Sequence, residues 1–247
     1  MNTDINSEEI YVNPQTLRAV FALRLNTYTT LVGTTILVYD YLLTYERERK
    51  YIWPAPWSII KCLYLATRYL PFFDTLVVLI RMVTPGLSLN TCYVLAVMNC
   101  YLYAVGMGMS ELILMIRTWA VWERNRKVGI GLAVYFVLLT TPTWWITAQF
   151  ANSFIFGAPP TPSSGCMLIH NSALNAVDWV LLVMIELGVL ILMIVKSARD
   201  YKQRRSPGLT LSKVILRDGI AYYINLFALS AVNIIIICTR NRLISFY

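Results

Sequence analysis

One apolar stretch, residues 93–116, constrains most strongly what this chain can fold into. It reads YVLAVMNCYLYAVGMGMSELILMI and is longer than the roughly 20 residues that cross the hydrocarbon core of a bilayer as a helix. Cys92 precedes it, and a strongly basic segment, residues 117–127, follows it. Basic residues next to a span resist translocation. The sequence therefore predicts a membrane-spanning helix with a cytoplasmic basic end and with Cys92 at the outer end.

The overall composition also indicates a membrane protein. Hydrophobic residues make up 57% of the 247 residues and charged residues only 14%, against about a quarter charged in soluble proteins. Mean hydropathy is +0.58. The net charge of +8 does not favour nucleic-acid binding, because the Lys and Arg residues lie in short clusters between apolar runs. We therefore expect the lipid bilayer as the surroundings of the chain and no nucleic-acid partner.

Six apolar runs predict six spans, so the expected fold is an all-α integral membrane helical bundle. Residues 1–24 would form an extracellular N-terminus, residues 25–238 a single transmembrane helical domain, and residues 239–247 a short C-terminal tail. The proline-rich residues 149–172 indicate an ordered loop. The predicted spans are 25–44, 57–80, 92–116, 128–148, 173–195 and 219–238.

The distribution of Lys and Arg between the predicted spans sets the orientation. The first, third and fifth connections are basic, whereas the second holds only Arg81 and the fourth holds none. Positive residues favour the cytoplasmic side, which places the N-terminus outside. The tail conflicts with this rule, because Arg240 and Arg242 would lie outside after six spans. Either the tail is a weak exception or the chain stops where a seventh span would begin.

Seven motifs are spread over most of the chain. They are YDYLLTYERE (39–48), YIWPAPWS (51–58), RYLPFFDT (68–75), RTWAVWERNRK (117–127), Gly165-Cys166, the region around Glu186, and LRDGIAYY (216–223). Together they resemble a large family of polytopic membrane proteins from mushroom-forming (basidiomycete) fungi, catalogued as a domain of unknown function. The resemblance implies a receptor-like plan of seven helices with the N-terminus outside. Because family members usually continue through one more span, it also implies a truncated or variant C-terminus here.

Two of the five cysteines are expected to form a disulfide. Cys92 begins the third predicted span on the outer side, and Cys166 lies in the outer loop before the fifth, where an oxidising environment permits the bond. The placement resembles the disulfide of G-protein-coupled receptors, which joins the start of helix three to the loop after helix four. Two free thiols are the alternative.

Six of the charged residues inside the predicted spans are taken as functional candidates, because ionisable side chains are costly there. Asp40 and Lys61 lie at similar depths and are expected to meet, and Arg68 is expected to be neutralised by Glu186 or Glu111. A buried pair can simply fix which helices are neighbours, so a structural role is one interpretation. Because the acids outnumber the bases, a polar cavity or proton path is the other. The six residues are Asp40, Lys61, Arg68, Asp74, Glu111 and Glu186.

A cytoplasmic basic surface is predicted from the third and fifth connections. Anionic lipid headgroups attract such residues by roughly 1 kcal/mol each. Contact with lipid is one interpretation, and a cytoplasmic protein partner such as a G-protein is the other. The residues of this surface are Arg124, Arg126, Lys127, Lys202, Arg204 and Arg205.

Missing motifs argue against catalysis. The only histidine is His170, in an outer loop, so neither a zinc site of several histidines nor a haem held by a histidine pair is expected. The sequence has no Gly-rich phosphate loop and no G-x-S-x-G elbow. We therefore expect no enzymatic activity, no metal and no cofactor.

The expected function is that of a receptor-like sensor with a small ligand in the bundle. Its expected location is the plasma membrane or another membrane of the secretory pathway. Against it, residues 111–119 hold no Asp-Arg-Tyr triplet, and no predicted span holds Asn-Pro-x-x-Tyr. A transporter or proton-coupled channel that uses the buried charges is the second hypothesis. A structural membrane scaffold is the third.

Overall fold

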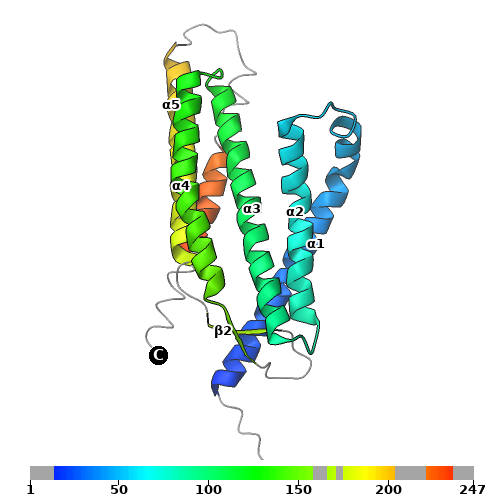
Figure 1. The fold of residues 1–247 in the computed structure, drawn as a ribbon. Coiled ribbons are helices and arrows are strands. Elements are labelled where there is room, and N and C mark those ends of the chain that lie inside the picture. The colour runs from blue at the N-terminus through cyan, green and yellow to red at the C-terminus, as the bar shows by residue number, and fades with distance from the viewer. Residues whose placement is uncertain (1–13, 158–165, 171–174, 204–220, 236–247) are drawn as a thin grey trace, which may run out of the picture.

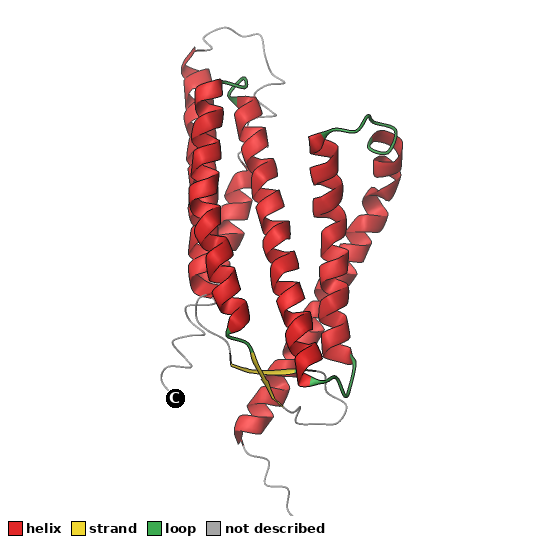
Figure 2. Ribbon diagram, in the orientation of Figure 1, coloured by secondary structure: helices red, strands yellow, loops and turns green. Residues whose placement is uncertain are grey.

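The structure, a computed structural model, describes residues 14–157, 166–170, 175–203 and 221–235 and shows long helices packed side by side (Figure 1). Among the described residues, strands occur only in one short ribbon at one end of the bundle (Figure 2). The elements are α1 (Pro14–Tyr51), α2 (Ile59–Val83), α3 (Leu89–Val121), α4 (Arg126–Asn152), β1 (Ile155–Gly157), β2 (Met167–His170) and α5 (Asn175–Gln203). A further helix, Ala221–Ile235, is called the 221–235 helix below.

Four of the described helices are long and apolar enough to cross a membrane. These segments, Ile59–Val83, Leu89–Val121, Arg126–Asn152 and Ala176–Arg199, correspond to the second to fifth predicted spans. Their outward side chains include many large apolar groups, for example Val137, Leu138 and Trp145 of α4, each at least 59% exposed. Such a surface suits hydrocarbon and not water. The chain is therefore consistent with a multi-pass membrane protein.

The described parts of the first and last predicted spans are helical, but neither helix is both long and apolar enough to count with these four. The prediction for residues 25–44 falls within α1, which is more polar than the four spans, and the described part of the last prediction is the shorter 221–235 helix. Threonines account for part of the polarity of α1. Their hydroxyls donate to carbonyl oxygens four residues back, as Thr30 does to Asn26 and Thr34 to Thr30. The helix thus satisfies these hydroxyls internally.

Three helices begin at side chains that cap a helix N-terminus. Ser58 accepts a hydrogen bond from the Lys61 N–H, and Ser88 accepts one from the Thr91 N–H. Asn125 starts α4 in the same manner. Each cap satisfies a backbone donor that has no partner within its helix. Local sequence therefore determines where α2, α3 and α4 start.

The apolar core lies where α3, α4, α5 and the 221–235 helix meet. Thr118 is fully buried there, and its hydroxyl lies 3.3 Å from the Tyr223 hydroxyl, which also lies 3.2 Å from the Leu114 carbonyl oxygen. The 221–235 helix is thereby joined to α3 by polar as well as apolar contacts. The buried members of the core are Leu114, Met115, Leu132, Ile185, Val189, Leu190, Met193 and Tyr223.

Gly188 of α5 lies directly against Tyr135 of α4. A Cβ added at Gly188 would lie 2.6 Å from the Tyr135 hydroxyl oxygen, and that hydroxyl donates to the Met184 carbonyl oxygen at 2.5 Å. The tyrosine thus crosses from α4 onto the backbone of α5. Only a residue without a side chain leaves room for it.

We expect Gly188→Ala to lower the free energy of unfolding by about 1–3 kcal/mol, because the new methyl group overpacks the site and displaces Tyr135. Thermal denaturation in detergent micelles, followed by circular dichroism, measures the change. Gly131→Ala on α4 is the matched control, since no atom lies within 4 Å of its new Cβ. Equal losses in the two variants would contradict the packing described here.

A two-stranded antiparallel ribbon closes one end of the bundle. β1 pairs with β2, and the backbone N–H of Cys166 donates to the Arg81 carbonyl oxygen at 3.1 Å. The all-α prediction agrees with the helical bundle, whereas the loop predicted for residues 149–172 differs in detail, because α4 continues to Asn152 and the ribbon follows it. Short apolar segments on both sides of the proline-rich stretch pair as strands, and the disulfide ties the β2 side of the ribbon to α3.

We name the two ends of the bundle by their chemistry. The disulfide end carries the ribbon and the start of α3, and the basic end carries the α1–α2 loop and the α3–α4 turn (Figure 1). The outside position of the N-terminus and the count of six spans stay predictions.

Candidate functional site

The disulfide joins the start of α3 to the ribbon. Cys92 and Cys166 are bonded with their Cα atoms 5.7 Å apart, which is the pairing that the sequence predicted. Cys92 is only 2% exposed. The bond, together with the hydrogen bond from Cys166 to Arg81, ties the ribbon to the ends of α2 and α3.

Arg68 of α2 pairs with α1 and not with α3 or α5. Its Nε lies 2.5 Å from Glu48 Oε2, although the N–H does not align as a hydrogen bond, and its Nη1 lies 3.9 Å from Asp40 Oδ2. The predicted partners Glu186 and Glu111 are therefore wrong. The physical reason is the length of α1, which stays helical beyond the predicted end at Thr44 and so brings Glu48 to face Arg68.

Glu48 and Arg68 are the centre of a set of side chains that we call the α1–α2 polar cluster. The Tyr69 hydroxyl donates to Glu48 Oε1 at 2.9 Å, Arg68 donates to the Thr44 hydroxyl, and the Arg68 guanidinium lies 5.3 Å from the centre of the Tyr41 ring. The Glu48 side chain has no exposed surface. The cluster consists of Asp40, Tyr41, Thr44, Glu48, Arg68 and Tyr69.

Lys61 does not meet Asp40, so that prediction is also wrong. Its Nζ donates to the carbonyl oxygens of Trp53 and Ala55, at 2.9 and 2.6 Å, and lies 4.7 Å from the centre of the Trp57 ring. The Asp40 side chain is 67% exposed. Because Lys61 stands in the first turn of α2, its side chain reaches back to the unpaired carbonyls of the α1–α2 loop. These contacts tie the start of α2 to that loop.

Two further acids lie toward the disulfide end. The Asn99 side-chain amide donates to Asp74 Oδ1 at 2.5 Å, which links α2 to α3, and the Thr147 hydroxyl donates to Asp178 Oδ2 at 3.2 Å, which links α4 to α5. Asp178 Oδ1 is buried without a hydrogen-bond partner among the described residues. Sequence reasoning missed Asp178, although an acid near the start of the apolar segment 173–195 was an available signal.

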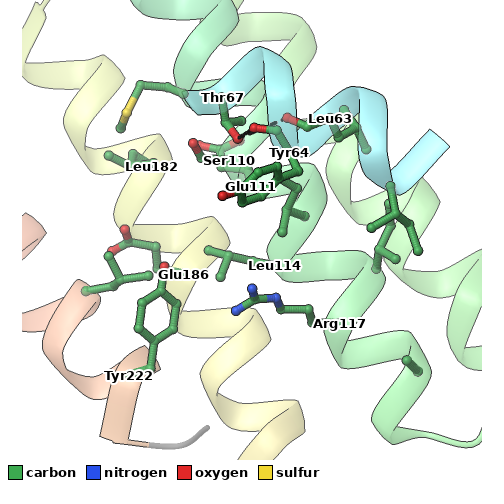
Figure 3. Close-up of a pocket in the computed structure, with 16 residues that line it drawn as sticks. Leu63, Tyr64, Thr67, Ser110, Glu111, Leu114, Arg117, Leu182, Glu186 and Tyr222 are labelled. Carbon is green, nitrogen blue, oxygen red and sulfur yellow. Dashed lines mark hydrogen bonds between the residues drawn. The ribbon is translucent and has the colours of Figure 1, made fainter. Parts of the chain in front are cut away.

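A cavity of about 540 Å³ lies in the half of the bundle nearer the basic end. Its walls come from α2, α3, α5 and the 221–235 helix, and its lining is mostly apolar (Figure 3). Ile60, 64% exposed, belongs to its rim. The polar and aromatic side chains of the lining are Tyr64, Thr67, Ser110, Glu111, Arg117, Glu186 and Tyr222.

Two carboxyl groups face this cavity, Glu111 from α3 and Glu186 from α5 (Figure 3). The residues are only 7% and 8% exposed. The Ser230 hydroxyl donates to Glu186 Oε1 at 2.8 Å, whereas Glu186 Oε2 has no hydrogen-bond partner in the described part of the chain. No Lys or Arg nitrogen of the described residues forms an ion pair with either carboxyl group. The site thus carries acidic groups without a basic counterpart.

Arg117 lines the same cavity without pairing with the acids. Its guanidinium carbon lies 5.9 Å from the centre of the Tyr222 ring. Arg117 is exposed, in contrast to Glu111 and Glu186. Its positive charge therefore lies at the exposed part of the lining and forms no ion pair with the two buried acids.

The predicted basic surface is described only in part. Arg124, Arg126 and Lys127 are exposed at the α3–α4 turn, whereas Arg204 and Arg205 lie outside the described residues and only the backbone of Lys202 is described. Contacts tie the end of α5 to this turn. Lys196 Nζ pairs with Glu123 Oε1 at 3.0 Å, and the Arg199 guanidinium lies 5.5 Å from the centre of the Trp122 ring. The described end of α5 therefore lies at the same end of the bundle as the α3–α4 turn.

Among the described residues, no three His, Cys, Asp or Glu side chains gather as a group that could hold a metal ion. His170 lies in β2, and its side chain is not described. The chemistry available at the cavity is that of two carboxyl groups, hydroxyl groups and aromatic rings.

Comparison with known proteins finds a family match for part of the chain. Residues 28–73 match the model of a family of unknown function, DUF6533. No curated protein and no solved structure matches the chain. The matched segment runs from α1 into α2 and contains every member of the α1–α2 polar cluster. The predicted likeness to a catalogued domain of unknown function is thus confirmed for these residues.

Proposed function

We propose that this chain is a non-enzymatic, receptor-like sensor that binds a small ligand inside its helical bundle. The observation that carries the proposal is the cavity between α2, α3, α5 and the 221–235 helix. Its volume of about 540 Å³ falls within the range of roughly 300–1,000 Å³ that is usual for small-molecule sites. A mostly apolar wall with a few polar groups is also typical of such sites.

The chemistry of the two ends supports an orientation for the sensor. The N-terminus and the disulfide end would face outward, since disulfides persist in oxidising surroundings. The basic end would face the cytoplasm, where anionic lipid headgroups and a cytoplasmic protein partner are the expected contacts. This arrangement fits the seven-helix plan implied by the resemblance to the fungal family, in the plasma membrane or another membrane of the secretory pathway.

A proton-coupled transporter or channel is the second candidate, and a specific observation favours it. Arg68 and Lys61 are occupied elsewhere, so Asp178, Glu186 and Glu111 have no basic partner among the described residues. Asp178 and Glu186 lie eight residues apart on α5, which is about 12 Å along a helix. Acids spaced in this manner along one helix are a feature of proton paths.

The test is ligand-dependent stability of the protein in lipid nanodiscs, measured against a diverse compound library. A ligand at 100 times its Kd stabilises the folded state by about 2.7 kcal/mol, which is visible as a higher midpoint of thermal unfolding. Ala120→Trp, which fills the lining of the cavity, should abolish the effect, and Ala133→Trp on the exposed face of α4 should retain it. A stabilising ligand that acts equally on both variants would contradict the assignment of the cavity.

Flux measurements separate the remaining hypotheses. A proton gradient across proteoliposomes that drives flux in the wild type, and not in Glu186→Gln, would favour the transporter over the sensor. If the protein shows no flux and no compound stabilises it, the structural scaffold is the hypothesis that remains.

A further inference from the structure

We propose that the cavity binds an organic cation, a protonated amine attached to an apolar body of moderate size. The inference rests on the proposed function in one respect, namely that the cavity binds a ligand. It goes further by naming the charge and chemical class of that ligand from the side chains that line the cavity.

The first step concerns charge. Glu111 and Glu186 are more than nine-tenths buried, and both enter the cavity from facing helices (Figure 3). A buried carboxylate without a counter-charge is strongly destabilising, and a bound cation removes that penalty. No basic side chain of the described residues pairs with either acid. A positively charged ligand is the group that this lining lacks.

The second step concerns hydrogen bonds. Ser230 occupies Glu186 Oε1, whereas Glu186 Oε2 is buried with no donor among the described residues. An ammonium group offers up to three N–H donors and a Coulombic attraction at the same time. Such a group between α3 and α5 would satisfy the free oxygen of Glu186 and face Glu111.

The third step concerns the rest of the ligand. Leu63, Leu114, Leu182 and Leu226 supply apolar wall, and Tyr64 adds an aromatic ring. Aliphatic or aromatic carbon would bury its surface here. An amine with a carbon body therefore matches both parts of the lining.

Other ligand classes fit the lining less well. An inorganic anion would face two acidic side chains. A hard metal cation takes six or more oxygen ligands, and the described residues hold no group of three acidic, Cys or His side chains. Arg117 also lines the cavity and counts against a cation, but it is exposed and stands over Tyr222 and not beside the acids. The ammonium group is therefore expected between Glu111 and Glu186, on the buried side of Arg117.

The experiment uses ligands that share a body and differ in charge. The probes are 4-phenylbutylamine, 4-phenylbutanol and 4-phenylbutyrate, together with smaller amines down to methylamine and their matched alcohols. Saturable binding to the full chain in neutral-lipid nanodiscs is measured by isothermal titration calorimetry, and empty nanodiscs correct for partition into lipid. We expect at least one amine to bind at least about tenfold more tightly than its matched alcohol, and the carboxylate to bind most weakly.

Matched variants locate the charge. Glu186→Gln and Glu111→Gln keep the size of the side chain and are expected to weaken amine binding by about tenfold or more, with little effect on the alcohol. Glu123→Gln is the control, because Glu123 lies at the α3–α4 turn with 85% of its side chain exposed. If a Gln variant fails to fold, Ala120→Trp tests the same cavity from its lining and should abolish binding.

The outcomes distinguish this inference from the proposed function. Amines that bind no more tightly than their alcohols, or that bind the Gln variants as tightly as the wild type, overturn the cation assignment. If an alcohol or carboxylate binds instead, in a manner that Ala120→Trp abolishes, the cavity is a ligand site for another chemical class and the proposed function stands. If neither these probes nor any library compound binds, both ideas fail.

Discussion

Arg68→Leu is expected to lower the free energy of unfolding by about 3–5 kcal/mol, the usual loss when one partner of a buried ion pair is removed. The variant would leave Glu48 charged, with no exposed side-chain surface. It would also remove the donor to the Thr44 hydroxyl and the cation beside the Tyr41 ring. Chemical denaturation in mixed micelles, followed by circular dichroism, measures the loss.

Two variants test whether the loss comes from the pair. Arg49→Leu removes an exposed arginine next to Glu48 on α1 and should change the free energy of unfolding by less than about 0.5 kcal/mol. The double variant Glu48→Leu/Arg68→Leu should recover much of the loss, since replacing both partners of a buried pair by apolar groups is often nearly neutral. A double variant that is less stable than Arg68→Leu would show that Glu48 acts independently of Arg68.

Loss of the disulfide is the second large effect that we expect. Cys92→Ser should lower the free energy of unfolding by about 2–5 kcal/mol, because the bond closes a loop between residues 74 positions apart and restricts the unfolded chain. Cys166→Ser and the double variant should lose the same amount, since each removes the same bond. Thermal unfolding in micelles compares the three variants.

Reduction and a free cysteine provide the controls. Dithiothreitol should destabilise the wild type to the level of the serine variants and should not change the double variant. Cys62→Ser should leave stability almost unchanged, because Cys62 is an exposed free thiol. If Cys92→Ser were as stable as the wild type, the ribbon would be held by its hydrogen bonds alone.

Much of the helical architecture was predictable because it depends on local properties. Length and apolarity alone indicate segments such as Ile59–Val83 and Ala176–Arg199, and the structure places helices there. The ribbon was not predicted, because β1 and β2 are only three and four residues long. Segments of that length carry too little pattern to be distinguished from a loop.

The two buried acids of the candidate site were predictable, but their pairings were not. Glu111 and Glu186 were named as buried acids, and both line the cavity. Their expected partner Arg68 lies against α1 instead. Depth along a helix is readable from residue numbers, but the direction in which a side chain points around the bundle depends on how neighbouring helices cross and where each helix ends.

By itself, the sequence determined the apolar helices, their capped starts and the cysteines available to staple one end, because these depend on composition and on short spacings along the chain. Only the tertiary structure decided that Glu48 and not Glu186 would neutralise Arg68, and that Glu111 and Glu186 would face one cavity without a base. The physical reason is that an ion pair needs two groups within about 4 Å, and contacts between helices are made by packing and not by any local preference of the residues concerned.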